Sequence, residues 1–287
     1  MLQRVVTYGR MIKFSHSIFA LPFALTSLAL AASEGFRPAQ ALWIVVAMVG
    51  ARSAAMGFNR LADQAIDARN PRTAGRELPR GLLTRAEVWV FVLASAAALV
   101  LAAGMLNPLC LALSPVALAV TWGYSYAKRF TALSHLVLGL SLAIAPVGAW
   151  LAVRGRFDVE PIVLALAVLC WVAGFDTIYA CQDAEFDRRE GLHSLPARLG
   201  IARALLVARA LHAAAVVLLG ALYVLTALHP LYLGGVALVA ALLIYEHSLV
   251  RADDLSRVDA AFFAVNGWVS VAYLVATTAA RALARGL

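Results

Sequence analysis

The sequence predicts an all-α integral membrane protein with about nine transmembrane helices. The first reason is composition: 63% of the 287 residues are hydrophobic and only 14% are charged, with a mean hydropathy of +0.83. A soluble domain of this size is far less apolar. The second reason is that apolar runs of about 20 residues, long enough to cross a bilayer as helices, recur along the whole chain. The third is that charged residues gather in the short connections between these runs.

The runs are interpreted as one transmembrane domain over residues 1–287. The first run follows a basic N-terminal lead, so a cleaved signal peptide is the alternative for that segment. We expect it to stay as a span, because further spans follow and because Arg10 and Lys13 suit a site at its edge. The predicted spans cover residues 14–32, 40–58, 86–105, 109–126, 133–153, 161–181, 202–227, 230–249 and 258–280.

The basic residues predict the orientation. Seventeen of the 24 Lys and Arg residues fall on the side of the N-terminus, and five fall on the other side. Because short cytoplasmic loops carry an excess of Lys and Arg, the N-terminus is predicted to be cytoplasmic, in a bacterial-type inner (plasma) membrane. The net charge of +8 is spread over these loops and forms no stripe, so no nucleic-acid partner is expected.

A polar stretch, NRLADQAIDARNPRTAGRELPRG, follows the second predicted span. Asn59, Asp63 and Asp67 recur every four residues, so in a helix they share one face. Mg²⁺ takes one or two carboxylates and completes its shell with water and substrate phosphate oxygens. The stretch therefore predicts a site for a diphosphate carrier. Two alternatives remain, a solvated positive loop and ion pairing of the acids with nearby arginines.

A second acidic stretch, DTIYACQDAEFDRREGLHSLPARLG, follows the sixth predicted span. Asp183 and Asp187 again stand four apart, and Asp176 lies about two helical turns before Asp183. The chain is thus interpreted as two pseudo-symmetric four-helix halves plus a ninth helix. Such a bundle would surround a central cavity open to the cytoplasm, and the two acidic stretches would face each other there around Mg²⁺ and one diphosphate.

Other cations are expected at the same membrane face. Lys13, Arg72, Lys128 and Arg129 are candidates for binding diphosphate, and simple positive-inside anchoring is the alternative for the last two. Tyr124 lies four residues before Lys128 and would share its face. An arginine inside an apolar run needs a partner, which for Arg52 is either an anionic acceptor substrate or a buried acid such as Asp176.

These stretches, together with YSYAKRFT and the following HLVLGL, resemble the membrane aromatic prenyltransferases of the UbiA superfamily, in the same order and over nearly the whole chain. The resemblance is strongest to the 4-hydroxybenzoate polyprenyltransferase branch, including a bacterial subgroup that serves menaquinone synthesis. The YxxxK element of the family matches Tyr124 and Lys128, and its DxxxD element matches Asp183 and Asp187. The first family motif is NDxxDxxxD, whereas this chain has Arg60 at the second position.

The resemblance implies Mg²⁺-dependent transfer of a polyprenyl group from its diphosphate, within the lipid bilayer, to an aromatic acid for respiratory quinone synthesis. The acceptor would be 4-hydroxybenzoate, prenylated beside its hydroxyl, or a hydroxynaphthoate. The metal would be held by Asn59, Asp63, Asp67, Asp183 and Asp187. Asp63 and Lys128 would take part in catalysis, and Asp183 would also draw off the phenolic proton. The competing classes are a membrane transporter and a Mg²⁺-dependent alcohol phosphotransferase.

Overall fold

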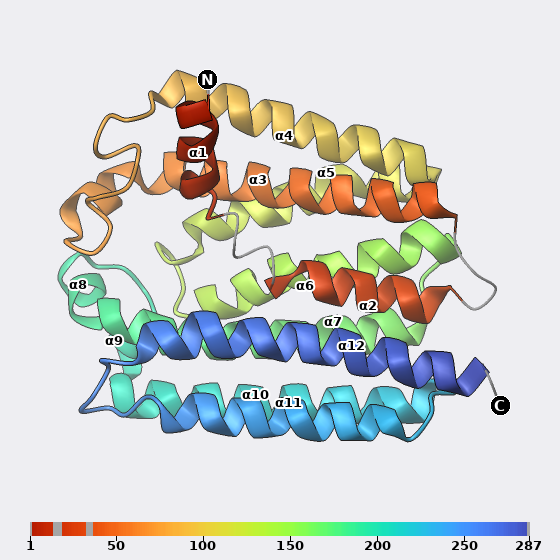
Figure 1. The fold of residues 1–287 in the computed structure, drawn as a ribbon. Helices are drawn as coiled ribbons and strands as arrows, with labels where there is room; N and C mark the ends of the chain where they lie inside the picture. The colour runs from red at the N-terminus through yellow and green to blue at the C-terminus, as the bar shows by residue number, and fades with distance from the viewer. Residues whose placement is uncertain (1, 14–18, 33–36, 286–287) are drawn as a thin grey trace. The chain divides into compact units, whose positions relative to one another are not determined.

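The computed structural model describes residues 2–13, 19–32 and 37–285, and its regular secondary structure over these ranges is helical (Figure 1). The predicted all-α membrane class is confirmed, since eight helices in the described chain are long and apolar enough to span a bilayer. The elements are α1 (Leu2–Met11), α2 (Leu21–Ala31), α3 (Pro38–Arg69), α4 (Arg85–Leu106), α5 (Pro108–Ala127), α6 (Ser134–Arg154), α7 (Val159–Ala180), η2 (Cys181–Asp183), α8 (Ala184–Arg189), α9 (Leu195–Leu199), α10 (Ile201–Leu225), α11 (Leu231–Ser248), η3 (Ala260–Val265) and α12 (Asn266–Arg285).

Two of the expected spans differ from the structure in length. The expected span 40–58 is part of α3, which has 32 residues and continues past Asn59, Asp63 and Asp67 to Arg69. The expected span 14–32 corresponds to α2, whose 11 residues are too few to cross a bilayer. Residues 14–18 of that expected span lie outside the described chain.

The described chain divides into two compact units. The first unit comprises residues 1–17 and 38–126, and thus α1, α3, α4 and most of α5. In this unit α3 packs closely on α4 at Gly50, where an added Cβ would lie 2.9 Å from the backbone nitrogen of Leu99. The ring of Phe58 on α3 stacks on Trp122 of α5 at 5.0 Å. These contacts fix the side of α3 from which the acidic residues project.

The second unit comprises residues 18–37 and 127–287. Its central element is α7, which packs on α6 and α10, and its core is a single apolar cluster. The short helix α2 belongs to this unit, so the units differ from the expected four-helix halves in this element. The reason is packing: Phe23 of α2 contacts Trp171 and Tyr273, and the Ser27 hydroxyl donates to the carbonyl of Pro146 at 2.5 Å.

Candidate active site

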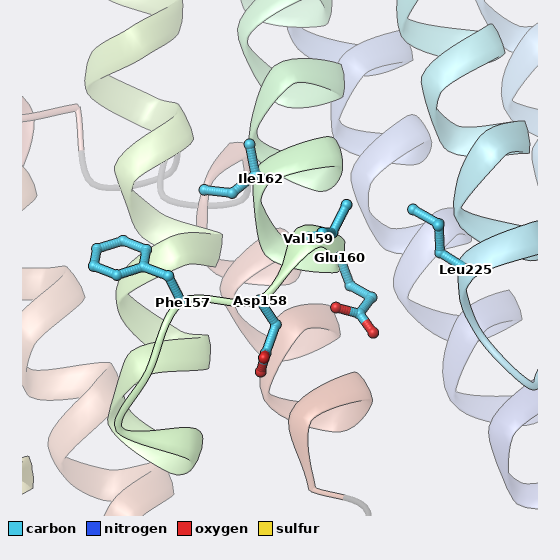
Figure 2. Close-up of a pocket in the computed structure, with 6 residues that line it drawn as sticks. All are labelled: Phe157, Asp158, Val159, Glu160, Ile162 and Leu225. Carbon is cyan, nitrogen blue, oxygen red and sulfur yellow. The ribbon is translucent and has the colours of Figure 1, made fainter.

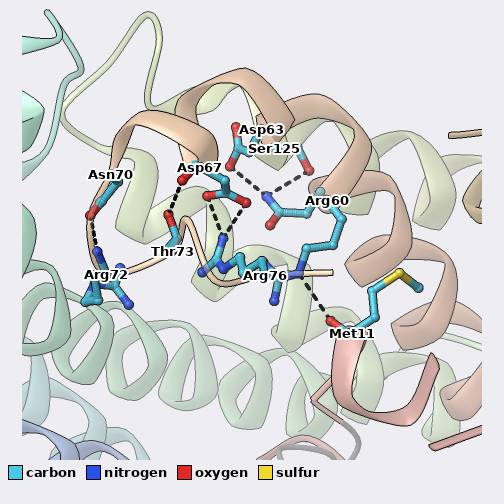
Figure 3. Close-up of polar contacts among 10 residues, drawn as sticks. Met11, Arg60, Asp63, Asp67, Asn70, Arg72, Thr73, Arg76 and Ser125 are labelled. Carbon is cyan, nitrogen blue, oxygen red and sulfur yellow. Dashed lines mark hydrogen bonds and ion pairs between the residues drawn. The ribbon is translucent and has the colours of Figure 1, made fainter. Parts of the chain in front are cut away.

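The acidic part of the first stretch, residues 59–67, lies on the last three turns of α3 (Figure 3). Asn59, Asp63 and Asp67 are 9%, 2% and 4% exposed, so they are buried side chains of a continuous helix. The solvated-loop alternative is therefore wrong for these acids. Asn59 donates through Nδ2 to Asp63 Oδ2 at 3.3 Å and to Ser125 Oγ at 3.5 Å (Figure 3). The side chains of Asn59 and Asp63 thus lie together, as the four-residue spacing predicts.

Asp67 is already bound to a cation of its own unit. Arg76 Nη1 lies 2.7 Å from both carboxylate oxygens of Asp67, and this arginine is only about one-fifth exposed (Figure 3). The turn that carries Arg76 is held by Thr73, whose hydroxyl donates to the backbone carbonyl of Asp67 at 3.1 Å. The ion-pair alternative is therefore realised at Asp67, while Asn59 and Asp63 form a separate oxygen-rich pair.

Arg60, the residue that departs from the family motif, points toward the end of α1. It is 4% exposed and donates from Nε to the backbone carbonyl of Met11 at 3.2 Å (Figure 3). Two turns earlier on α3, Arg52 donates to the backbone carbonyl of Lys13 at 3.3 Å. Carbonyls at a helix C-terminus attract cations, so both arginines hold the end of α1 against α3. Lys13 there has a positive φ of 47°.

The second acidic stretch follows α7 through a break in the helix. Asp183 ends the 3₁₀ turn η2, and Asp187 lies in the six-residue helix α8. Both side chains are partly exposed, in contrast to the buried acids on α3. The backbone carbonyl of Asp187 accepts from the amide of Leu192 at 2.8 Å, which closes α8 onto the loop that follows.

The other predicted site residues are divided between the units. Tyr124 lies on α5 in the first unit, and Arg72 lies exposed in the turn after α3, where its backbone amide donates to Asn70 Oδ1 at 2.9 Å. Lys128 and Arg129 lie in the second unit, in the turn directly after α5. The Lys128 carbonyl accepts from the amide of His193 at 2.6 Å, which joins this turn to the loop after α8.

Asp176 has a partner that the sequence did not predict. Its Oδ2 lies 2.7 Å from Nδ1 of His135, which is 3% exposed in the first turn of α6. The two residues are 41 positions apart, and nothing in their local spacing indicates the contact. The partner of Asp67 could have been found more easily, because Arg76 lies in the arginine-rich stretch that follows Asp67.

The donor chemistry of both stretches fits Mg²⁺. Asn59, Asp63 and Asp67 offer amide and carboxylate oxygens in one unit, and Asp183 and Asp187 offer carboxylates in the other. A magnesium ion needs only one or two protein carboxylates when substrate phosphates and waters complete its shell. In the described part of the chain, no three His, Cys, Asp or Glu side chains gather as an all-protein metal cage would require.

A surface pocket at the start of α7 lies far from the second acidic stretch. It has a volume of about 690 Å³ and is lined by Phe157, Asp158, Val159, Glu160, Ile162 and Leu225 (Figure 2). Asp158 accepts from the Trp150 indole at 2.9 Å and pairs with Arg156 at 3.2 Å. Because α7 separates this pocket from Asp183 by 22 helical residues, the pocket lies roughly 33 Å from the second acidic stretch.

Comparison with known proteins identifies the family. The family model described as the UbiA prenyltransferase family matches residues 20–283. This chain belongs to that family. A protein of Aromatoleum aromaticum named 4-hydroxybenzoate octaprenyltransferase is 32% identical over 259 residues, which cover 85% of this chain and 83% of that protein. One of Cronobacter sakazakii with the same name is 31% identical over 260 residues, covering 88% and 87%.

Solved structures confirm the UbiA fold. The apo structure of a UbiA homolog from Aeropyrum pernix K1 superposes with a TM-score of 0.83 at 37% identity and covers 95% of this chain and 98% of its own. A UbiA homolog from Archaeoglobus fulgidus, solved with DMAPP and Mg²⁺, has a TM-score of 0.75 at 18% identity, with coverage of 96% and 99%. At that identity the second likeness concerns the fold alone. The predicted membership among multi-pass membrane prenyltransferases is confirmed.

Proposed function

We propose that this UbiA family member transfers a polyprenyl group from a polyprenyl diphosphate to an aromatic acid, with Mg²⁺, in respiratory quinone synthesis. The observation that carries the proposal is the Asn59–Asp63 pair, two buried oxygen-bearing side chains in contact on one face of α3. Buried carboxylates beside a membrane span are costly and mark functional sites. The four-residue spacing recurs at Asp183 and Asp187, as a site with two acidic motifs requires.

The residues proposed to hold the metal are Asn59, Asp63, Asp67, Asp183 and Asp187. Bound Mg²⁺ would neutralise the charge of the diphosphate and so make it a better leaving group. The side chains of Lys13, Arg72, Lys128 and Arg129 donate hydrogen bonds to the diphosphate oxygens. Each donor aimed at developing negative charge contributes about 3 kcal/mol to transition-state stabilisation.

The proposed transfer breaks one bond and forms another. The electron pair of the allylic C–O bond leaves with the diphosphate, and the ring carbon beside the hydroxyl of the acceptor attacks the allylic cation. Asp183 accepts the phenolic proton as the ring attacks, and returns it to the oxygen when the attacked carbon loses its hydrogen to water as a proton, which restores the aromatic ring. Tyr124 and Arg52 orient the acceptor, whose carboxylate matches the planar guanidinium of Arg52.

The proposed acceptor is 4-hydroxybenzoate, which the names of the relatives support. A hydroxynaphthoate for menaquinone is the second candidate, because it also offers a carboxylate, a hydroxyl and a flat face. The site is proposed to face the cytoplasm from a bacterial inner membrane, in accordance with the excess of basic residues on that side.

The proposal is tested with purified protein in detergent, Mg²⁺ and a polyprenyl diphosphate. 4-Hydroxybenzoate and a dihydroxynaphthoate compete in one reaction, and products are identified by mass spectrometry. A prenylated aromatic acid that disappears with a chelator and returns with Mg²⁺ supports the proposal, and its identity selects the acceptor. If the protein gives no prenylated product, and after reconstitution in liposomes transports a solute whether or not a chelator is present, the transporter alternative replaces the proposal.

A further inference from the structure

We infer that His135 and Asp176 are positioning residues that hold the second acidic motif in its binding geometry. They act through residues 190–195, which comprise the loop after α8 and Leu195 at the start of α9 and are hereafter called the α8–α9 loop. This inference rests on the proposed function, because it assigns a role to residues that support Asp187 and Lys128. It names two residues outside the proposed set of metal and substrate ligands.

Each ring nitrogen of His135 has a defined hydrogen-bond partner. Its Nε2 accepts a hydrogen bond from the backbone amide of Leu195 at 3.2 Å, so this nitrogen carries no proton. The ring proton of the neutral imidazole is then on Nδ1, which lies 2.7 Å from Asp176 Oδ2 and donates to it. The contacts therefore form one chain of hydrogen bonds, hereafter the relay, from the Asp176 carboxylate through the buried imidazole to the backbone of the α8–α9 loop.

The same loop is also joined by hydrogen bonds to the turn after α5. The amide of His193 donates to the Lys128 carbonyl at 2.6 Å, and the Ser134 hydroxyl donates to the His193 carbonyl at 3.4 Å. At its other end the loop is closed onto α8 by the bond from Leu192 to the Asp187 carbonyl. Lys128 and Asp187 are thus both joined by backbone hydrogen bonds to the loop that His135 anchors.

The helix α8 is too short to keep its position without an anchor. A helix of six residues is not stable by itself, because the cost of nucleation is recovered only over longer helices. The loop after α8 turns at Gly191, which has φ of +67°. Without the contact between His135 and Leu195, we expect α8 and the loop to open more often. Asp187 would then bind metal less tightly, because the loss of a residue that orients a metal ligand weakens metal binding.

Two substitutions at His135 separate the two halves of the relay. His135→Gln places an amide oxygen near the Nε2 position and keeps an acceptor for Leu195, whereas His135→Asn keeps a donor near Nδ1 for Asp176 and loses the acceptor. Asp176→Asn retains the shape of the carboxylate and removes its charge. We expect His135→Asn to raise the Mg²⁺ concentration for half-maximal turnover about tenfold, Asp176→Asn to raise it less, and His135→Gln to restore most of the loss.

The matched control is His229→Gln. Nδ1 of His229 also accepts a backbone amide, that of Leu231 at 3.2 Å, but between α10 and α11. Glutamine places its polar atoms near the Nε2 position and not at Nδ1, so this variant loses the same kind of bond elsewhere in the second unit. It should leave the Mg²⁺ dependence unchanged.

Two measurements without turnover complete the test. Hydrogen exchange of the Leu192 and Leu195 amides should quicken at least tenfold in His135→Asn and stay slow in His229→Gln. Mn²⁺ binding, followed by electron paramagnetic resonance in the presence of inorganic diphosphate, should weaken about tenfold in the first variant only. Unchanged exchange and Mn²⁺ affinity in a folded His135→Asn protein would overturn the inference. Absence of Mg²⁺-dependent prenyl transfer in the unsubstituted protein would instead overturn the proposed function, whatever the exchange rates.

Discussion

The two acidic motifs have the same spacing but are held in place by different means. The first lies on the uninterrupted helix α3, where Asn59 and Asp63 are buried and Asp67 is bound by Arg76. The second lies across a helix break, on η2 and the six-residue α8, and its acids are partly exposed. The first is thus positioned by a helix backbone, and the second by hydrogen bonds from a loop.

The difference teaches that one chemical motif can be kept rigid by local or by tertiary structure. On α3 the spacing of the proposed ligands is maintained by the hydrogen bonds of the helix itself. After α7 the spacing depends on His135, Asp176 and the α8–α9 loop, which are separated along the chain from the acids they support. We therefore expect the second motif to be the more sensitive of the two to substitutions outside its own acids.

The largest expected effect is the loss of a carboxylate charge in either motif. Asp63→Asn and Asp187→Asn should each lower kcat by about 1,000-fold or more. Each variant would hold Mg²⁺ less tightly, and the negative charge of the diphosphate would then be poorly compensated. Both proteins should remain folded and inserted, which gel filtration in detergent checks. Asp253→Asn is the control, since Asp253 is exposed in the loop after α11. Normal turnover of either motif variant would contradict its place in the metal site.

The next effect tests how the first unit is held together. Arg60→Asp introduces the residue of the family motif where this chain has a buried arginine bonded to the Met11 carbonyl. The new carboxylate would face that carbonyl without a partner, so the free energy of unfolding should fall by about 3–5 kcal/mol. Denaturant titration in detergent measures it. Arg80→Asp, at an exposed position, should change it by less than about 0.5 kcal/mol. Equal effects would show that Arg60 is not an anchor.

Close helix packing can be compared between the units with two glycines. An added Cβ at Gly139 of α6 would clash with the Leu169 carbonyl of α7, and one at Gly50 would lie 2.9 Å from the backbone of α4. Gly139→Ala and Gly50→Ala should each destabilise by about 1–3 kcal/mol, with Gly139→Ala the larger effect, because overpacking forces the backbones apart. Thermal unfolding measures both.

The control for this pair is Gly148→Ala, because no atom outside the local backbone of α6 lies within 4 Å of a Cβ added there. It should be neutral or stabilise by up to about 1 kcal/mol, since alanine is the better helix former. Stabilisation by all three substitutions would mean that the helices at Gly50 and Gly139 are not in close contact.

The smallest expected effect concerns the ion pair between Arg76 and Asp67 in the first motif. Arg76 and a metal ion compete for the carboxylate of Asp67, so Arg76→Gln should raise Mn²⁺ affinity in the absence of diphosphate by about tenfold, or 1.4 kcal/mol. Mn²⁺ binding followed by electron paramagnetic resonance measures the change. The exposed Arg80→Gln has the same change of charge and is the control. Weaker binding in Arg76→Gln would show that the arginine supports the metal site.

The sequence alone determined the features that depend on residues near one another in the chain. Apolar runs predicted the all-helical membrane class, because a bilayer accepts only segments that satisfy their own backbone hydrogen bonds. The four-residue spacing predicted that Asn59 and Asp63 would lie together, because a helix returns to the same face about every 3.6 residues. The sequence could not predict that α3 would continue through these residues, because the apolar run ends where the polar stretch begins.

Only the tertiary structure decided which partners those residues have. It assigned Arg76 to Asp67, the Met11 carbonyl to Arg60 and His135 to Asp176. The last two pairs join residues 49 and 41 positions apart. Such contacts depend on how helices pack, and packing is set by the shapes of many side chains together. A hydrogen bond needs its donor and acceptor close together and well oriented, so for residues far apart in the chain their spacing carries no information about it.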